Sequence, residues 1–487
     1  MLELAFAALF HRHHVIAGSF FPCKQHRFPL QLLFFNNDLK VFKDWCINIA
    51  MSLTDHPKAY GTAAFAIAFG AGILVTLGFK DLYPDLESRF QDKRRKKSLG
   101  PRRASLFWST PVQLEDHEET PTLAHDGIAG NGIAGCIGNT PLVRIQSLSE
   151  ATGRTILAKC EFLNGAGNSP KDRVALSLIQ EAERQGLLTP HRGDTIYEGT
   201  VGSTGISLAT LARAMGYKAH ICMPDDQSLE KSNLLLHLGA TVERVRVAPI
   251  TSPDHFVNLA RRRAAEHEKL ANDGSKGFFA DQFENPANWH AHVSTTGPEI
   301  WKQTKGDVDA FVAGAGTGGT IAGVARYLKL EAKADKLKIV LADPQGSGLY
   351  NKIKHGVMYS ATEKEGTRRR QQVDSMVEGI GVNRITENFE AGRDLIDDAI
   401  KVTDEQACRM ARWLVEKDGI FVGSSSSVNC VAAVVAAMSL PPNSQVVTIL
   451  CDSGIRHLSK FWKHIKEEGL EDEEAKDLFT ELNLPQD

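Results

Sequence analysis

The chain has 487 residues, of which 42% are hydrophobic and 24% charged. This composition is typical of globular protein, and the length predicts more than one domain. A formal net charge of −3 gives no reason to expect nucleic acid as a partner, and eight scattered cysteines without a CxxC pair argue against a disulfide framework and predict no metal site.

The first part of the chain predicts a leader and a membrane anchor. Residues 1–50 are aromatic-rich without a clear period, and we expect residues 1–58 to form a disordered leader outside the folded part. Residues 59–79 carry no charge and are long enough for one membrane-spanning helix, which needs about 20 residues. The basic run 93–97 should stay in the cytosol, together with everything that follows it. Such an anchor resembles those of mitochondrial outer-membrane proteins, with the catalytic part facing the cytosol.

The rest of the chain predicts an α/β fold. Residues 80–125 are charged and aperiodic, as in a linker. Between 126 and 466, short apolar runs alternate with amphipathic helices, which favours mostly parallel sheets covered by helices in two α/β subdomains. We place the smaller subdomain at roughly 172–290, with a helical stretch at about 253–305. Residues 355–375 read as an exposed charged insertion, and 467–487 as an exposed acidic tail.

The segment 168–173 places a lysine at the start of a helix. Ser169 suits the N-cap, Pro170 the first helical position, and Asp172 a variant of the capping box. Apolar residues then recur at helical spacing until Gly186: Val174, Leu178, Ile179 and Ala182. The helix dipole and Arg173 should lower the pKa of Lys171 and make its amine a better nucleophile. Taken alone, the segment equally permits a solvated surface lysine.

Two glycine loops join strands to helices and predict anion sites. Residues 314–320 (GAGTGGT) offer free N–H groups and the Thr317 and Thr320 hydroxyls to a phosphate. This loop also fits G-x-G-x-x-G, with Asp343 after the next strand, so a nicotinamide-dependent oxidoreductase is an alternative. Residues 199–205 (GTVGSTG) suit a carboxylate. The hydroxyls of 423–427 and 451–454 also follow apolar runs, which favours one shared crevice.

In this order, the motifs resemble the cysteine synthase and cystathionine β-synthase family. These motifs are IGNTPLVR from residue 137, KDR with Lys171, DQFENPAN from residue 281, GTGGT, VEGIG from residue 377 and DSG from residue 452. The resemblance runs from about Gly135 to Lys460, and within the family the chain is most similar to the fungal, membrane-anchored cysteine synthases. It implies the tryptophan-synthase-like fold type II and pyridoxal 5'-phosphate as cofactor.

The resemblance also implies roles for individual residues. Lys171 would be the catalytic residue and would bind the cofactor covalently, and Ser453 would hydrogen-bond its ring nitrogen. Its phosphate would be held by Gly316, Thr317, Gly318, Gly319 and Thr320. The substrate carboxylate would be bound by Thr200, Gly202, Ser203 and Thr204, with Gln282 closing over it. Ser203 would also contact the cofactor, and Gly379 and Gly381 would line the mouth of the site that binds cofactor and substrate.

The activity that this resemblance implies is a β-replacement. Sulfide would displace the acetoxy group of O-acetyl-L-serine to give L-cysteine and acetate, in a homodimer. Homocysteine as acceptor, giving cystathionine, is the related alternative. The loop departs from the family's usual TSGNTG at Val201 and Ser203, and GSSSS replaces the usual GISSG. A cofactor-binding scaffold with weakened activity is therefore a third interpretation.

Overall fold

The computed structural model describes residues 130–227, 229–271, 273–358, 375–470 and 477–484, which belong to one compact unit, Glu119–Asp487. The predicted leader, the anchor at 59–79, the linker at 80–125 and most of the insertion at 355–375 lie outside the described residues. Within the described ranges, no helix combines the length and the apolar character that crossing a membrane requires.

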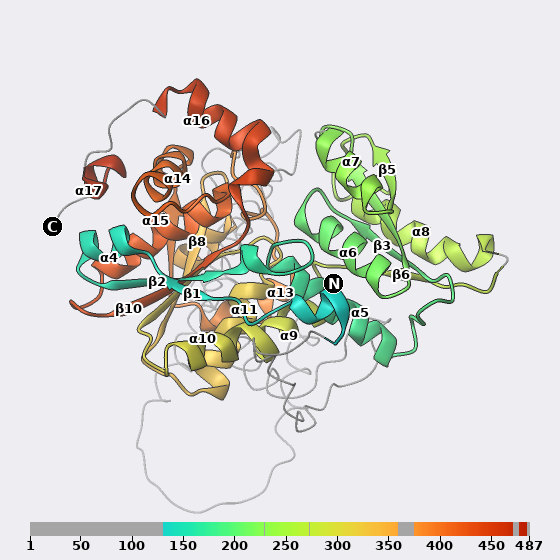
Figure 1. The fold of residues 1–487 in the computed structure, drawn as a ribbon, viewed down its shortest axis with the longest axis horizontal. Coiled ribbons are helices and arrows are strands. Elements are labelled where there is room, and N and C mark those ends of the chain that lie inside the picture. Colours follow the sequence, from blue (N-terminus) through green and yellow to red (C-terminus); the bar gives the residue numbers. More distant parts are fainter. Residues whose placement is uncertain (1–129, 228, 272, 359–374, 471–476, 485–487) are drawn as a thin grey trace, which may run out of the picture. The chain divides into compact units, whose positions relative to one another are not determined.

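The larger sheet has six strands and carries most of the core (Figure 1). Its order is β1 (Leu142–Arg144), β2 (Thr155–Cys160), β10 (Gln445–Leu450), β7 (Ala310–Gly314), β8 (Lys338–Pro344) and β9 (Asp398–Val402). All pairs are parallel except β1 with β2. Alternate residues of β10 enter two different cores, since Val446 and Leu450 face one cluster while Val447 and Ile449 face another. Both faces of this sheet are therefore covered, as the continuous apolar runs predict.

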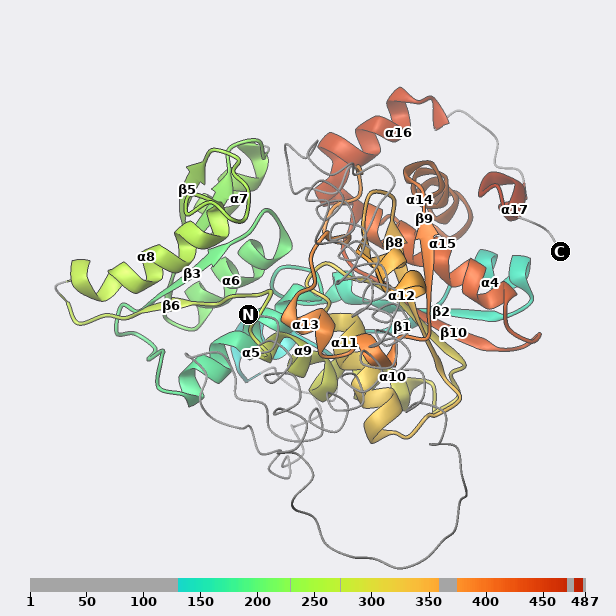
Figure 2. The ribbon, with the colours of Figure 1, turned by 180° about the vertical axis from the view of Figure 1, so that it is seen from behind.

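Helices from distant parts of the chain cover those two faces. One cluster includes side chains of α4 (Gln146–Thr152), α14 (Asp404–Asp418) and α15 (Ser424–Met438). The other includes side chains of α10 (Gly297–Gln303), α11 (Gly319–Arg326), α12 (Leu349–His355) and α13 (Glu387–Glu390). Figure 2 shows α10 to α13 from the side on which they lie in front. A further short helix, α16 (Lys463–Glu467), follows the last strand.

The smaller sheet is parallel throughout and forms the second subdomain. Its order is β5 (Thr241–Val245), β4 (Lys218–Pro224), β3 (Thr195–Gly199) and β6 (Gly277–Phe279). The helices beside it are α5 (Lys171–Arg184), α6 (Ser203–Ala214), α7 (Leu229–His237) and α8 (Phe256–Leu270). Cys222 of β4 packs on α8, while its neighbour Ile221 approaches α6 at Gly205. The sheet is thus enclosed between helices, which confirms the predicted α/β class.

Two sequence predictions are wrong in detail. The helical stretch expected at 253–305 contains β6, which pairs with β3 and is too short to show an alternating pattern. The tail is not wholly exposed either, because Leu478 and Leu482 are buried around α17 (Leu478–Glu481) and join the larger core. These two leucines lie four residues apart, so they share one apolar helix face within an acidic segment.

Candidate functional site

The segments that carry the candidate residues meet at the carboxyl ends of parallel strands. The loop after β3 leads into α6, the loop after β7 leads into α11, and residues 451–454 follow β10. Parallel strands bring their carboxyl ends to one edge, where ligands of open α/β sheets collect. α9 (Ala287–Ala291) continues through a π-helical turn into α10 and runs beside the loop after β7.

Lys171 is the first residue of α5, but the cap differs from the predicted one. Pro170 occupies the N-cap position, and Ser169 Oγ accepts a bond from the Lys171 amide at 3.3 Å. Asp172 does not complete a capping box with Ser169. Its carboxylate accepts from the Gly167 amide and from Ser207 Oγ, both at 2.6 Å, so it joins the start of α5 to α6. The residue next to the lysine thereby ties the first turn of α5 to α6.

Burial, more than neighbouring charge, makes the Lys171 amine a base. Desolvation lowers the pKa of Lys171, and the nearby Cys451 and Asp452 oppose this only in part. The predicted contribution of Arg173 is wrong, because its guanidinium is paired with the carboxylates of Glu161 and Glu299. An amine with a lowered pKa is neutral more of the time and serves better as nucleophile and base.

A buried ionic network, which the sequence analysis missed, lies behind Lys171. Arg173 donates to both oxygens of Glu161 at 2.8 Å and to both oxygens of Glu299 at 2.6 and 2.8 Å. Lys159 pairs with Glu299 at 2.6 Å. Burial disfavours the charged form of Glu161, but Arg173 and Lys159 overcome it and lower the pKa of Glu161 to about 2. Burial lowers the pKa of Lys159, and its pairing with Glu299 opposes this only in part. Arg173, Glu161 and Glu299 remain charged, and together with Lys159 they fasten α5 to β2 and α10.

The loop 314–320 is shaped so that only glycine fits at several positions. A Cβ at Gly316 would lie 2.1 Å from the Gly379 carbonyl oxygen, and one at Gly319 would lie 1.9 Å from Asn288 Oδ1. Gly318 has φ +84°, in the left-handed region that favours glycine. No side chain caps α11, and its first turn has no acidic residue. Its first N–H groups could therefore hold an anion, as the sequence analysis predicts.

Two buried polar residues hold the threonines of this loop. Asn288 Nδ2 donates to Thr317 Oγ1 at 3.0 Å, and His292 Nε2 lies 3.2 Å from Thr320 Oγ1. Burial, and then Arg173, lowers the pKa of His292 to about 3, so the ring is neutral. Asn288 is the last residue of the DQFENPAN motif and His292 lies four residues after it, and the sequence analysis gave neither residue a role.

The VEGIG segment closes one side of the loop. The Gly381 amide donates to the Ala315 carbonyl at 2.8 Å, and the Gly379 carbonyl lies against Gly316. Gly379 has φ +86° and open space around its missing Cβ, as expected for a residue at a mouth. The Glu378 amide donates to Ser424 Oγ at 3.1 Å, which gives a structural role to one hydroxyl of the GSSSS segment.

The loop 199–205 presents polar groups at the start of α6. Thr200 and Thr204 are buried, whereas the side chain of Val201 is exposed to solvent. The Gly202 amide donates to Thr200 Oγ1 at 3.4 Å, and α6 has no side-chain cap. Gln282 is buried against the loop, and its Oε1 accepts from Thr204 Oγ1 at 2.5 Å. The structure therefore brings Gln282 to the loop on which the sequence analysis placed it.

Ser203 and Ser453 face the same region from opposite subdomains. Arg456 Nη1 donates to Ser203 Oγ at 3.4 Å, and its Nη2 donates to the Gly167 carbonyl next to the lysine segment. Ser453 Oγ accepts from the Ile455 amide at 3.3 Å, which leaves its own O–H free to donate. Arg456 is a further residue that the sequence analysis missed, since an arginine after a loop carries no motif of its own.

These residues fit pyridoxal phosphate. The glycine-lined N-terminus of α11 suits the phosphate dianion, the Lys171 amine with its lowered pKa suits the aldehyde, and the Ser453 hydroxyl suits a ring nitrogen. A nicotinamide site fits less well. Asp343 is fully buried, and its Oδ2 accepts from the Tyr350 amide at 2.7 Å, so its carboxylate is engaged at the start of α12 rather than presented to a ribose.

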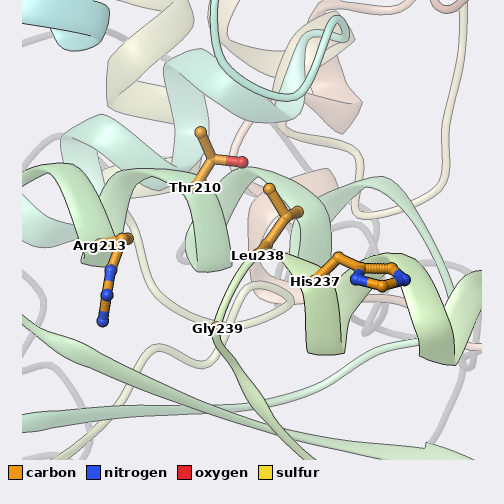
Figure 3. A pocket seen from close by; sticks show the side chains of 5 residues that line it. All are labelled: Thr210, Arg213, His237, Leu238 and Gly239. Carbon is orange, nitrogen blue, oxygen red and sulfur yellow. The ribbon is translucent and has the colours of Figure 1, made fainter.

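Two other features of the smaller subdomain lie apart from this site. A hollow of about 270 Å³ is lined by Thr210, Arg213, His237, Leu238 and Gly239, near the C-terminal end of α6 and away from the glycine loop at its N-terminal end (Figure 3).

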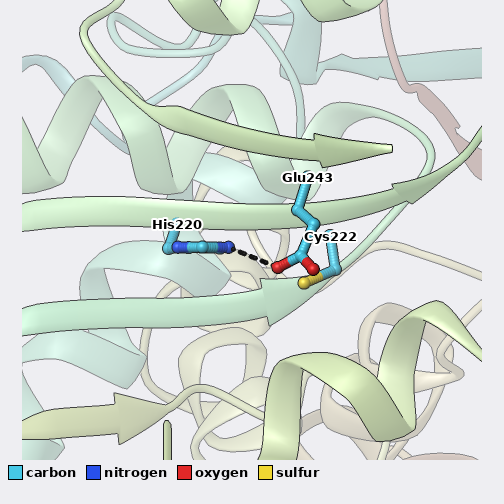
Figure 4. Close-up of side chains that lie close together, drawn as sticks. All are labelled: His220, Cys222 and Glu243. Atoms are coloured by element: carbon cyan, nitrogen blue, oxygen red, sulfur yellow. Dashed lines mark hydrogen bonds and ion pairs between the residues drawn. The ribbon is translucent and has the colours of Figure 1, made fainter. Parts of the chain in front are cut away.

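Figure 4 shows the second feature, a cluster of His220, Cys222 and Glu243 on β4 and β5. Glu243 is already bound by Arg263 at 2.8 Å and by His220 at 3.1 Å. Burial, and then Glu243, raises the pKa of Cys222 to about 12, so the thiol keeps its proton. We read the cluster as a hydrogen-bonded unit and assign it no ion.

Comparisons with known proteins agree with this site. A model of the pyridoxal-phosphate-dependent enzyme family matches residues 133–452. Cysteine synthase 2 of Neurospora crassa is 70% identical over 89% of this chain and 99% of that protein. Cystathionine β-synthase of Rattus norvegicus is 40% identical over 67% of this chain and 54% of that protein. A crystal structure of O-ureido-L-serine synthase superposes with a TM-score of 0.57 at 30% identity, covering 71% of this chain and 96% of the other.

The match of the family model to most of the chain confirms the predicted fold type and cofactor, and it replaces the nicotinamide alternative. The chain belongs to the family of pyridoxal-phosphate-dependent enzymes, and its cofactor is pyridoxal phosphate.

Proposed function

We propose that the protein is a cysteine synthase that replaces the acetoxy group of O-acetyl-L-serine by sulfide and releases L-cysteine and acetate. The observation that carries this proposal is the similarity of nearly the whole chain, at 70% identity, to a protein named cysteine synthase 2. The site supports it, because an amine whose pKa is lowered by burial lies among loops suited to a phosphate and a carboxylate.

Each side chain has a role in binding or in proton transfer that follows from its contacts. Bound pyridoxal phosphate supplies an electron sink that lets the α-carbon lose its proton and the β-substituent depart. The Nζ of Lys171 accepts that proton, which a neutral amine can do. The loop 200–204 and Gln282 bind the substrate carboxylate, while Gly316 to Thr320 hold the phosphate. A serine hydroxyl at residue 453 donates to the ring nitrogen without adding a charge.

Turnover by the purified protein tests this proposal. With O-acetyl-L-serine and sulfide we expect equal amounts of L-cysteine and acetate, measured by chromatography against time. Formation of cystathionine with homocysteine, but no cysteine with sulfide, would instead support the related cystathionine β-synthase activity. If no β-substituted serine reacts, the protein is the weakened scaffold, and Val201 and Ser203 are the substitutions to reverse first.

We also propose that residues 59–79 anchor the enzyme in the mitochondrial outer membrane, with the catalytic part facing the cytosol, and that it works as a homodimer. The uncharged run and the basic run 93–97 support the anchor. The name of a Saccharomyces cerevisiae relative, 57% identical over 69% of this chain, assigns that protein to mitochondria. The full chain should resist carbonate extraction from mitochondria and be cleaved by external protease, whereas a chain lacking 59–79 should be extracted. Extraction of the full chain would rule out the anchor.

A further inference from the structure

We propose that Glu198 is a positioning residue that fixes the Gln282 side-chain amide and thereby sets how tightly the loop 200–204 binds the substrate carboxylate. The inference rests on the proposed function, because its ligand is the α-carboxylate of an amino-acid substrate. Neither the sequence motifs nor the roles implied by the family resemblance include this residue.

Glu198 lies where β3 enters the loop, and its side chain holds Gln282 at two points. It is fully buried. Its Oε2 accepts from the backbone N–H of Gln282 at 3.2 Å, and its Oε1 accepts from the side-chain Nε2 of Gln282 at 3.4 Å. Oε1 also accepts from the Gly199 amide at 3.1 Å. One carboxyl group therefore fixes the backbone and the side chain of Gln282, as well as the first residue of the loop.

These contacts give the Gln282 amide a single orientation. Its Oε1 faces the loop and accepts from Thr204 Oγ1 at 2.5 Å, while its NH₂ group faces Glu198 and the Gly199 carbonyl at 3.4 and 3.5 Å. The two bonds from Nε2 are long and therefore weak. The NH₂ group thus retains donor capacity for a carboxylate that docks beside Thr204, provided that Glu198 does not compete strongly for it.

The charge on Glu198 decides how strongly it competes. Within the described part of the chain, the carboxyl group has no ion-pair partner, and Asp281 and Cys222 are the titratable groups that interact with it. Asp281 is in turn under the influence of Arg261, Arg384 and Glu284. Burial, and then Asp281, raises the pKa of Glu198 to about 8. Near neutral pH the group is mostly an uncharged acid, which leaves Gln282 available to the substrate.

Ionisation of Glu198 should weaken substrate binding for two reasons. A buried carboxylate binds the NH₂ group of Gln282 more strongly, and it repels the substrate carboxylate. Both effects raise KM as the pH rises through about 8. They leave kcat unchanged, since neither touches the reacting carbon. Glutamine at position 198 can still accept from Gln282 but cannot ionise, so it should remove this pH dependence.

Steady-state kinetics of the holoenzyme and of Glu198→Gln with O-acetyl-L-serine test the idea. We expect the KM values of the two proteins to lie within about twofold of each other at pH 6.5. The ratio of the wild-type KM to the variant KM should then grow up to about tenfold by pH 9, as one ionisation requires. Taking the ratio cancels the ionisation of the substrate amine. Asp281→Asn should move the rise to lower pH, because it removes the repulsion that raises the pKa of Glu198.

Thermal unfolding provides a readout that does not depend on turnover. The folded-state pKa of Glu198 is raised above the ordinary value of 4.5, so the folded state keeps this proton longer than the unfolded chain does. The carboxyl group therefore costs the folded state progressively more stability as the pH rises from about 4.5 to about 8. The Tm of Glu198→Gln relative to wild type should increase over this interval.

The possible results separate the two proposals. A flat KM ratio together with a flat Tm difference would overturn the role of Glu198 while leaving the proposed function standing. A rise in KM with a parallel fall in kcat would also overturn it, because it would point to a general structural role. Absence of any turnover by the wild-type protein would overturn the proposed function, and this inference with it.

Discussion

Lys171→Ala should lower cysteine formation by more than about 10³-fold, because it removes both the group that binds the cofactor and the base that accepts the α-proton. The fold should persist, since the lysine donates to no described side chain that holds α5 in place, and Asp172 and Arg173 remain. Turnover measured with O-acetyl-L-serine and sulfide gives the loss, and circular dichroism reports the fold.

Mass analysis after hydride reduction identifies the attachment point directly. The wild-type protein should carry the cofactor mass on the peptide that contains Lys171, and the variant should carry none. Lys463→Ala is the matched control, because its side chain is 64% exposed and its ion pair within the described residues is with Glu467 on the surface. Ordinary turnover by Lys171→Ala, or a cofactor mass on another lysine, would contradict the assignment.

The sequence predicted elements best where a short apolar run lay between clear turn signals. The apolar run 241–245 predicts a strand that coincides with β5. The runs 219–223, 310–313 and 446–450 predict strands that differ from β4, β7 and β10 by one residue at one or both ends. Helix starts are less accurate. The pattern after the glycine loop predicts a helix from Ile206, but α6 begins at Ser203, because the polar residues of the loop already adopt helical geometry. The three-residue β6 gave no periodic signal at all.

The site was predicted as far as its residues lie in glycine loops and at helix starts. Lys171, the phosphate loop and Gln282 carry local patterns whose chemistry can be read directly. The residues that pair with them and shift their pKa values carry no such local pattern. Glu299 lies 126 residues from Arg173, and nothing in the spacing reveals that the two pair. For the same reason, the sequence analysis assigned Arg173 an effect on the pKa of Lys171, although the guanidinium is paired with two carboxylates.

Arg173→Ala should reduce the free energy of unfolding by about 3–5 kcal/mol, because it leaves the buried carboxylate of Glu161 and the partly buried one of Glu299 without their main partner. Urea denaturation followed by tryptophan fluorescence measures this loss. Arg184→Ala on the same helix is the matched control. Its side chain is 62% exposed and pairs with Glu181, so its removal should cost at most about 1 kcal/mol. Equal losses in the two variants would show that the buried network does not stabilise α5.

Arg173→Lys separates the charge of this residue from its shape. Lysine keeps the positive charge but cannot donate in parallel to the two oxygens of both carboxylates, as Arg173 does. We therefore expect Arg173→Lys to lose an amount of unfolding free energy between the losses of Arg173→Ala and Arg184→Ala. Activity should fall along the same series even in protein that remains folded, because Arg173 lies two residues after Lys171 and fixes the first turn of α5. If Arg173→Lys were as stable and as active as wild type, the network would act through charge alone, and the hydrogen-bond geometry would not be what holds the lysine in place.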